Sequence, residues 1–205
     1  MERAARQADI KEACLEEALR LIEERGIESL SLRDVARRIG VSHQAPYKHF
    51  PSRDHILAEL VTRSFDEFAT FLQDRPTEAD PACDLGAMGL AYLAYARKHP
   101  LKYRLMFNTP IQDPAAHPVM MQKARKAFAL LRDRLATMPV RPDMTGLPPS
   151  ANLEALFVWS AIHGLATILD SDVMQTLGLT DDEINHAVAR CMARLSLAID
   201  PAGLV

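Results

Sequence analysis

The sequence of 205 residues predicts an all-α protein, and three observations lead to this fold class. Apolar residues recur at intervals of three and four in one segment after another, as in helices that bury one face. No segment alternates apolar and polar residues as a half-buried strand does. Glycine and proline separate the apolar segments, where helices commonly end. With 48% hydrophobic residues, the chain has ample material for a buried core.

The first expected helix carries an apolar stripe and ends at Gly26. The stripe consists of Ile10, Cys14, Ala18, Leu21 and Ile22. Glycine commonly ends a helix because it adopts left-handed backbone angles without strain. Five glutamates between residues 12 and 24 would repel a polyanion. We therefore expect this helix to support its neighbours while its acidic side faces solvent.

Residues 31–50, with the sequence SLRDVARRIGVSHQAPYKHF, combine two helix starts with a glycine turn. Ser31 is an expected N-cap whose hydroxyl accepts from the N–H of Asp34, and it opens a short helix over residues 32–38. Gly40 allows the left-handed turn that follows. Ser42 is the expected cap of a second helix over residues 42–49, which begins with small and polar side chains. Such a start can approach base edges closely, so the pattern predicts a helix-turn-helix.

Positive charge is concentrated in this segment. Arg33, Arg37, Arg38 and Lys48 oppose one acid, Asp34, so residues 31–50 carry a formal charge of +3 in a chain whose net charge is -3. Phosphate contacts dominate the affinity of proteins for DNA, so the position of the cations matters more than the net charge. The alternative is an ordinary helix pair around a glycine turn, which occurs in many helical proteins.

A resemblance favours DNA binding. The run LRDVARRIGVS at residues 32–42, followed by APYKHFP at residues 45–51 and by Arg53, closely resembles the signature of the tetracycline-repressor (TetR) family of bacterial transcription regulators. The resemblance covers residues 9–63. It implies that residues 42–49 form the recognition helix, that Tyr47 and Arg53 contact phosphates, and that residues 43–45 face bases. The DNA-binding candidates are Arg33, Ser42, His43, Gln44, Ala45, Tyr47, Lys48, His49 and Arg53.

Two of these candidates leave alternatives open. Gln44 stands where the family often has glycine or another small residue. Its amide can bond N6 and N7 of adenine together, or else a phosphate or a water. Arg53 lies in the first turn of the next expected helix, where a docked phosphate would meet both the cation and the helix N-terminus. Otherwise Arg53 is a solvated side chain near Asp54.

The remaining chain is predicted to be helical over residues 52–73, 81–98, 101–108, 119–138, 150–171 and 180–199. Residues 108–118 hold three prolines and are an expected loop, and residues 141–150 are the most loop-like stretch. We therefore expect two domains. Residues 1–51 form a three-helix DNA-binding domain, and residues 52–205 form a helical bundle for ligand binding and dimerisation.

The last two expected helices predict a homodimer. The helix at residues 150–171 is apolar nearly all round and needs cover on more than one side. In the helix at residues 180–199, Ile184, Val188, Cys191, Leu195 and Ala198 form a seam of the coiled-coil type. Two such helices from each subunit would make a four-helix interface, and paired recognition helices would read a palindromic operator in double-stranded DNA. A monomeric helical core is the alternative.

Trp159, His163 and Gly164 resemble the tryptophan-histidine-glycine signature of one C-terminal class in the TetR family, together with residues 92–107 upstream. The resemblance implies a chamber for a small, largely apolar ligand. Its expected lining is Tyr92, Tyr103, Met106, Phe107, Met120, Met121, Phe128, Trp159 and His163. We expect Gly164 to let a neighbouring backbone come close. The alternative for His163 is a hydrogen-bonded core residue.

These patterns predict a DNA-binding transcriptional regulator, expected to be a homodimeric repressor that a small-molecule effector releases from its operator. An activator, or a regulator without an effector, is the second possibility. An enzyme is the least favoured class, because the sequence has no phosphate loop, nucleophile motif or metal-ligand spacing. We expect no cofactor or metal, three isolated buried cysteines, no membrane segment and a cytoplasmic location.

Overall fold

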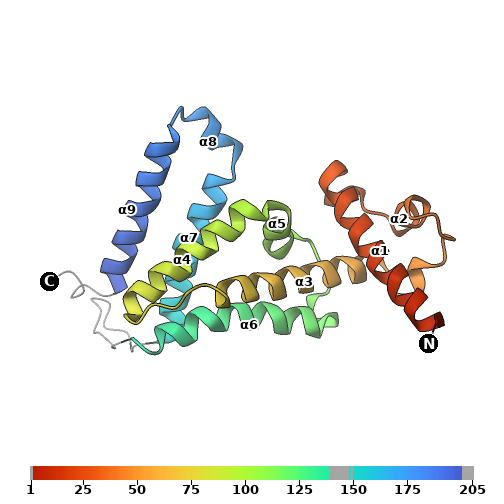
Figure 1. Cartoon of the computed structure of the whole chain (residues 1–205), viewed down its shortest axis with the longest axis horizontal. Coiled ribbons are helices and arrows are strands. Elements are labelled where there is room, and N and C mark those ends of the chain that lie inside the picture. The colour runs from red at the N-terminus through yellow and green to blue at the C-terminus, as the bar shows by residue number, and fades with distance from the viewer. Residues whose placement is uncertain (1, 139–147, 149, 200–205) are drawn as a thin grey trace. The chain divides into compact units, whose positions relative to one another are not determined.

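The computed structural model describes residues 2–138, 148 and 150–199, and these residues form helices and no strands (Figure 1). The all-α prediction is therefore confirmed. The α-helices are α1 (Glu2–Arg25), α2 (Leu32–Arg38), α3 (Arg53–Gln73), α4 (Pro81–Lys98), α5 (Pro100–Asn108), α6 (Pro118–Leu135), α7 (Ala151–Leu169), α8 (Asp172–Thr176) and α9 (Asp181–Ile199). Short 3-10 helices lie at η1 (Ile27–Ser29), η2 (Pro46–Lys48) and η3 (Pro114–Ala116). The sequence did not predict α8, and the loop-like segment at residues 141–150 falls largely outside the described residues.

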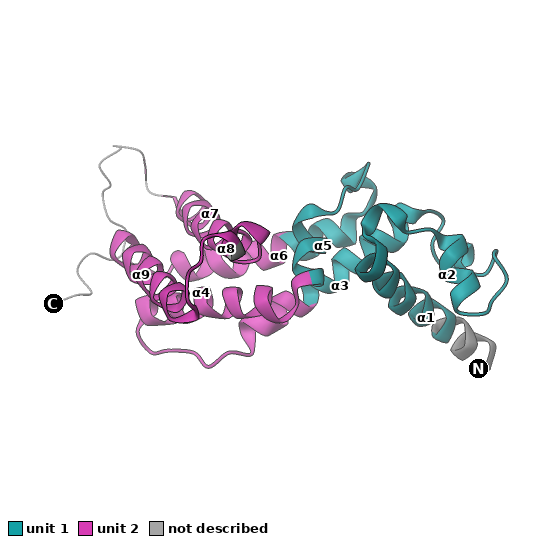
Figure 2. Cartoon of the chain, turned by 90° about the horizontal axis from the view of Figure 1, so that it is seen from above, with its two compact units in different colours: residues 1–66, 101–124 teal, residues 67–100, 125–205 magenta. Residues whose placement is uncertain are grey.

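The chain divides into two compact units (Figure 2). Unit 1 comprises residues 1–66 and 101–124, and unit 2 comprises residues 67–100 and 125–205. The long helix α3 therefore contributes its first two thirds to unit 1 and its end to unit 2. The domain boundary predicted between residues 51 and 52 stays a prediction.

Unit 1 has a continuous apolar core under the predicted helix-turn-helix. Cys14, Ala18 and Leu21 of α1 are buried, as are Val35 and Ala36 of α2. Helix α1 ends at Gly26, whose φ of 80° is the left-handed conformation expected there. Gly40, with φ of 72°, makes the predicted turn after α2. Both glycines thus mark the helix ends that the sequence indicated.

The start of α2 differs from the prediction in its capping. The hydroxyl of Ser31 makes no capping hydrogen bond. The N–H of Val35 donates to the carbonyl of Ser31 at 3.0 Å, which is the first hydrogen bond of the helix, and the carboxylate of Asp34 pairs with Arg37 at 2.7 Å. Ser31 is therefore the N-cap residue as predicted, but the predicted hydrogen bond from the N–H of Asp34 to its hydroxyl is wrong.

The predicted recognition helix at residues 42–49 is a series of tight turns. Residues 43–45 form a turn and η2 follows at Pro46–Lys48. The N–H of Ala45 donates to Ser42 at 2.9 Å and that of His49 to Pro46 at 2.9 Å, both in the i to i−3 pattern. Pro46 has no N–H to donate to Ser42, which removes an α-helical bond at this place. The helical part of the predicted recognition helix is thus shorter than the sequence predicted.

Unit 2 is built around α4, which contacts both α7 and α9. Tyr95 of α4 is fully buried, and burial raises the pKa of its hydroxyl. Gly89 lets α9 pack closely, because a Cβ added there would lie 2.6 Å from Cε of Met192. Ile184, Val188, Met192, Leu195 and Ile199 of α9 are half-buried. The seam predicted on α9 for a partner is therefore used in part by its own chain.

The three cysteines do not share one environment. Cys14 is buried, and burial raises the pKa of its thiol. Cys83 and Cys191 are exposed, so the prediction of buried thiols is wrong for both. Cys83 lies in the first turn of α4, and Cys191 lies on a side of α9 that the other described residues leave exposed.

Candidate nucleic-acid interface and buried polar cluster

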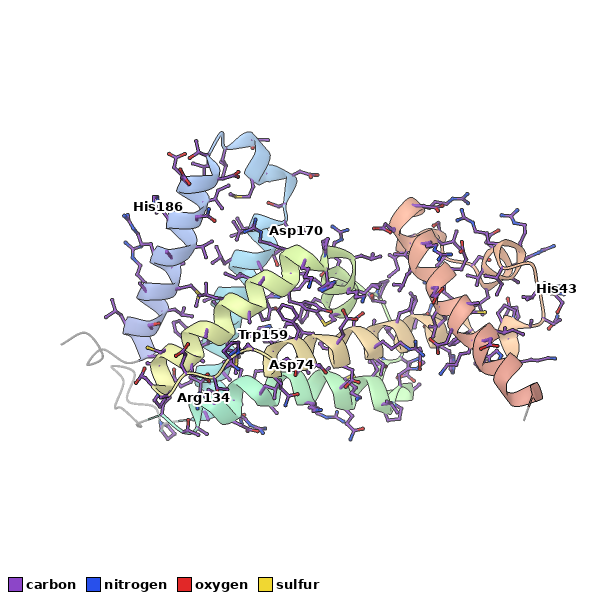
Figure 3. The ribbon with its side chains drawn as sticks, in the orientation of Figure 1. His43, Asp74, Arg134, Trp159, Asp170 and His186 are labelled. Carbon is purple, nitrogen blue, oxygen red and sulfur yellow. The ribbon has the colours of Figure 1, made fainter. Side chains whose placement is uncertain are left out.

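The turn after α2 and the first turn of α2 enclose a surface hollow of about 410 Å³, lined by Arg33, His43, Gln44 and Tyr47. All four side chains are exposed, and Figure 3 shows His43 on the chain segment that follows α2. A cation, two side chains with hydrogen-bonding nitrogens and a phenol thus share one concave surface. These groups can bond both phosphates and base edges.

The cations around this hollow differ in how freely they can reach a phosphate. Within the described residues, Arg33 and Lys48 form no ion pair and are exposed. Arg37 is exposed and pairs with Asp34 of its own helix. Arg38 lies 3.1 Å from Glu17 and 2.7 Å from Glu24, both on α1. Arg38 therefore holds α2 on α1.

This ion pairing shifts the pKa of both partners. The hydrogen bond from Arg38 lowers the pKa of Glu24, and the hydrogen bonds to Glu24 and Glu17 raise the pKa of Arg38. A second set joins α1 to α3: Arg63 pairs with Glu12 at 2.5 Å, and Lys11 with Glu59 at 3.0 Å. Hydrogen bonding to Arg63 is the main cause that lowers the pKa of Glu12.

The expectation that the acidic side of α1 faces solvent is therefore wrong for one of its glutamates, and two others are exposed but bound to cations. Glu17 is 6% exposed, and Glu12 and Glu24 are paired with cations of α3 and α2. A set of acids along one helix suggested a solvated face, whereas their partners lie 14 to 51 residues away in the sequence. The acids serve to orient the helices that carry the hollow.

The other DNA-binding candidates are placed less uniformly. Ser42 is exposed, whereas Ala45 and His49 are half-buried. A guanidinium nitrogen of Arg53 donates to the carbonyl of Ile27 at 2.7 Å and lies 3.6 Å from a carboxylate oxygen of Glu28. The side chain of Arg53 is 31% exposed. It links the start of α3 to η1, so a role as a phosphate contact stays a prediction.

Four of the nine predicted ligand-chamber residues come together in unit 2. The hydroxyl of Tyr92 on α4 lies 2.9 Å from Nδ1 of His163 on α7. The indole N–H of Trp159 donates to the same hydroxyl at 3.4 Å, and the ring of Phe128 on α6 lies 6.1 Å from that of Trp159. Figure 3 labels Trp159 on α7. We call Tyr92, Phe128, Trp159 and His163 the polar-aromatic cluster.

The chemistry of this cluster is that of a neutral, mostly apolar site. Burial lowers the pKa of His163, which favours the uncharged imidazole near neutral pH. An indole can only donate, so the hydroxyl oxygen of Tyr92 accepts from Trp159 and its proton can point to Nδ1 of His163. The cluster thus joins three polar groups in a partly buried place among aromatic rings.

The other five predicted ligand-chamber residues belong to unit 1. Tyr103, Met106 and Met120 are buried, and Phe107 and Met121 are half-buried. The rings of Tyr103 and Phe107 on α5 lie 5.1 Å apart, and Phe65 of α3 packs against Phe107 at 5.8 Å. The nine predicted residues are therefore divided between the two units, and a common chamber stays a prediction.

An ion-pair cluster in unit 2 was not predicted from the sequence. Asp84 of α4 is 3% exposed and lies 2.6 Å from a nitrogen of Arg75 and 2.9 Å from Nε of Arg134. The same carboxylate accepts from the backbone N–H of Glu78 at 2.9 Å. An aspartate in an apolar helical segment is the only signal in the sequence. It carries no information about which distant arginines will pair with it.

Two further placements bear on the predictions. A Cβ added at Gly164 would meet nothing within 4 Å, so no backbone of the described residues makes the expected close approach. Among the described residues, no group of three or more histidine, cysteine, aspartate or glutamate side chains could hold a metal ion.

Comparison with protein families decides the assignment. Residues 15–60 match the family described as bacterial regulatory proteins of the tetR family, and residues 85–195 match the Tetracyclin repressor-like C-terminal domain. The chain belongs to the TetR family. It is a DNA-binding transcriptional regulator, as the sequence predicted, and the α2 region with its hollow lies inside the matched N-terminal part.

Relatives of this TetR-family chain carry similar names. An HTH-type transcriptional regulator of Mycobacterium tuberculosis is 25% identical over 186 residues, which cover 89% of this chain and 80% of the relative. The HTH-type transcriptional repressor DrrR1 of Streptomyces coeruleorubidus is 29% identical over 134 residues, or 61% of this chain and 44% of that protein. This chain thus spans less than half the length of DrrR1.

Solved structures of the TetR type share the fold. The TetR family transcriptional regulator PfmR from Thermus thermophilus superposes with a TM-score of 0.60 at 21% identity, covering 91% of this chain and 96% of PfmR. A transcriptional regulator from Rhodococcus sp. Rha1 has a TM-score of 0.65 at 24% identity, covering 92% and 96% of the two chains.

Proposed function

We propose that this TetR-family regulator is a homodimeric repressor that binds a palindromic operator and is released from it by a small, largely apolar molecule. The observation that carries the proposal is the exposed hollow formed by Arg33, His43, Gln44 and Tyr47, with Lys48 free to reach a phosphate beside it. The Streptomyces relative DrrR1 is named a transcriptional repressor, which supports repression rather than activation.

Within this interface we assign Lys48 to phosphate and Gln44 to bases. Loss of a phosphate contact lowers the affinity for all DNA sequences alike. Loss of a base contact lowers the discrimination between bases at one or two positions of the site. Lys48→Ala should therefore lower affinity uniformly and reduce the salt slope by about one. Gln44→Ala should lose roughly 1 to 3 kcal/mol of discrimination.

The experiment is selection of binding sites from random DNA, followed by affinity measurements at several salt concentrations. Arg125→Ala on α6 is a control, because it removes an exposed cation far along the sequence from the hollow. If Gln44→Ala weakens every sequence equally and leaves the selected site unchanged, Gln44 binds phosphate and the base assignment is wrong. If wild-type protein selects no sequence, the repressor proposal fails.

We place the dimer contact on α7, with α9 beside it. Leu153, Leu156, Phe157 and Ile168 of α7 are each about half exposed or more. By length and composition alone α7 is also apolar enough to cross a membrane. Because α7 carries Asn152, Glu154 and His163, we favour burial of its apolar side chains against a second subunit over a membrane span. A regulator that binds an operator also works in the cytoplasm, where the DNA is.

The dimer is tested by sedimentation at micromolar concentration. Leu156→Glu should give a monomer, because it puts an unpaired charge in the proposed interface. Leu90→Glu on α4 is the matched control, since Leu90 is 51% exposed and Leu156 is 52% exposed. A wild-type monomer that binds its operator would refute the dimer.

We propose that the effector binds next to the polar-aromatic cluster. An effector that favours the DNA-free form by about 1 to 3 kcal/mol would lower operator affinity roughly 5- to 150-fold, and operator would weaken effector binding by the same factor. Trp159 supplies a fluorescence signal for a screen of small apolar compounds. His163→Ala should change the response to an effector while operator binding persists.

Two outcomes would contradict this assignment. If His163→Ala unfolds the protein or weakens operator binding as much as it weakens the response, then His163 is a core residue. If no compound changes both Trp159 fluorescence and operator affinity, a regulator without a small-molecule effector is the better conclusion.

A further inference from the structure

The side chain of Arg53 joins the two ends of the helix-turn-helix. Arg53 opens α3, just after the turns at residues 42–49, and Ile27 opens η1, just before α2. Nη2 of Arg53 donates a hydrogen bond to the carbonyl oxygen of Ile27 at 2.7 Å. This bond therefore closes a loop of the chain that contains α2, Gly40 and the residues of the hollow.

The carbonyl of Ile27 is also part of the turn that leads into α2. The backbone N–H of Leu30 donates to the same oxygen at 3.2 Å, and Leu30 is buried. The next residue, Ser31, is the N-cap of α2. A carbonyl oxygen has two lone pairs, so it can accept from Leu30 and Arg53 together. The start of α3 is thereby tied to the backbone from which α2 begins.

The first turn of α3 is held by a second segment as well. The carboxylate of Asp54 accepts from the backbone N–H of Gln112 at 3.3 Å, and the ring of His55 lies 5.0 Å from that of His117. Both partners lie between α5 and α6 and belong to unit 1. Arg53 thus connects η1 to a helix start that is itself fixed in place.

Three observations distinguish Arg53 from the cations that can reach a phosphate. Its side chain is 31% exposed, and its Nε atom is buried without a hydrogen-bond partner among the described residues. The carboxylate of Glu28, which is 81% exposed, lies 3.6 Å from Nη2. A phosphate that approached this nitrogen would meet the negative charge of Glu28 and would compete with the carbonyl of Ile27. By contrast, Arg33 and Lys48 are exposed and form no ion pair with other described residues.

We propose that Arg53 is a positioning residue, which acts on DNA binding through its bond to Ile27 and not through a phosphate. The bond holds α2, which carries Arg33, at a fixed spacing from the turns that carry Gln44 and Tyr47. For Arg53 this role replaces the phosphate contact that the family resemblance implies. The proposal goes beyond the proposed function, because it applies equally to a repressor and an activator, and to a dimer and a monomer.

The two roles predict different effects on DNA binding. Hydrogen bonds to base edges need close placement of the side chains, whereas attraction to phosphates is long-ranged and tolerates small shifts. Loss of a positioning residue should therefore lower the affinity for the operator much more than the affinity for random DNA. Loss of a phosphate contact should lower both affinities by the same factor and reduce the salt slope by about one.

Affinity measurements with the full-length protein separate the two roles, using the site selected from random DNA and a random duplex of the same length at several salt concentrations. Arg53→Met should lower operator affinity about tenfold or more, the cost of roughly one lost base contact. It should change the affinity for random DNA by less than about threefold and leave the salt slope unchanged. Lys48→Met is the matched comparison, because it removes a cation that we assign to phosphate. It should lower both affinities alike and reduce the slope by about one.

Arg53→Lys separates the charge from the hydrogen bond, and it also serves if Arg53→Met fails to fold. Lysine keeps the positive charge, but its nitrogen lies one bond short of the position of Nη2. Arg53→Lys should therefore lower operator affinity about threefold or more and keep the affinity for random DNA. In the protein without DNA, the backbone amide of Leu30 should exchange faster with solvent than in wild type, because its acceptor at Ile27 has lost its tie to α3. Lys48→Met should leave this exchange unchanged.

Three results would overturn the proposal. Arg53 contacts a phosphate if Arg53→Met lowers the affinities for operator and random DNA by one common factor and reduces the salt slope by about one. The charge matters, and not the bond, if Arg53→Lys binds the operator as tightly as wild type. An unchanged exchange rate of Leu30 in Arg53→Lys would show that the bond does not hold η1. This last measurement requires no operator, so it tests the proposal even if the repressor proposal fails.

Discussion

The Asp84 cluster allows the sharpest prediction about stability. Among the described residues, Asp84 is the only acid that contacts both Arg75 and Arg134, at 2.6 and 2.9 Å, and its side chain is 4% exposed. Asp84→Asn keeps the size of the side chain and its acceptor for the N–H of Glu78. The substitution removes the negative charge and puts an NH₂ donor in place of the oxygen that faces both arginines, so two cations are left without an acceptor.

The expected cost follows from the burial of these cations. The side chain of Arg75 is 11% exposed and that of Arg134 is 25% exposed, so neither can become fully hydrated without moving. Removing one partner of a buried ion pair costs about 3 to 5 kcal/mol. Because Arg134 retains some access to water, we expect the free energy of unfolding to fall by about 3 kcal/mol. The Asp84→Asn protein should still fold at neutral pH.

The assay is urea unfolding followed by circular dichroism, at one protein concentration because a dimer's stability depends on it. With a slope of about 2 kcal/mol per molar urea, the midpoint should fall by roughly 1.5 M. Asp133→Asn on α6 is the control, because Asp133 is 67% exposed and pairs only with its neighbour Arg132 among the described residues. Its cost should stay within about 0.5 kcal/mol.

A further variant separates charge from packing. In Arg75→Met, Asp84→Leu, Arg134→Met, no charge is left behind, so much of the lost stability should return. The reasoning is refuted if Asp84→Asn costs no more than Asp133→Asn. It is also refuted if the triple variant is less stable than Asp84→Asn, since packing rather than charge would then hold this part of unit 2 together.

Three other outcomes can be checked in the same way. Gly40→Ala should destabilise the protein by about 1 to 2 kcal/mol, because φ of Gly40 is 72°. Gly86→Ala, in a helix with room for a Cβ, should instead stabilise it by roughly 0.5 to 1 kcal/mol. Equal effects of the two substitutions would exclude backbone strain at Gly40. Asp80→Ala should cost about 1 kcal/mol in urea unfolding, because Asp80 accepts from the N–H of Cys83 at the start of α4. Burial lowers the pKa of His163, so the unfolded chain binds a proton at this histidine more readily than the folded protein does. The free energy of unfolding should therefore fall as the pH drops below about 6.5, and His163→Gln should reduce this fall. An unchanged pH dependence of stability in His163→Gln would contradict this role of His163.

Local patterns identified the helices well. The ends of α1 and α2 follow from Gly26 and Gly40, because only glycine takes left-handed angles without strain. The prediction failed at residues 42–49, where Pro46 removes a helical hydrogen bond, and it missed α8, which has only five residues. Short elements depend on neighbouring packing more than on their own periodicity.

Pairing between residues far apart in the sequence could not be predicted from local patterns. The sequence indicated no partner for the acids of α1, yet Glu17 and Glu24 pair with Arg38, and Glu12 pairs with Arg63. Arg53 looked available for phosphate but donates to the carbonyl of Ile27. In each case the side chain has several possible partners of equal charge, and only the packing of the helices brings one of them within bonding distance.

The sequence by itself determined the all-helical class, the position of the helix-turn-helix and the TetR family, because apolar periodicity, glycine turns and a local motif are all properties of neighbouring residues. Tertiary structure alone decided which cations remain free beside the hollow. It also decided which residues join the polar-aromatic cluster, and which side chains of α7 are exposed in the described structure. These are matters of distance between segments far apart in the chain, and no local pattern contains that distance.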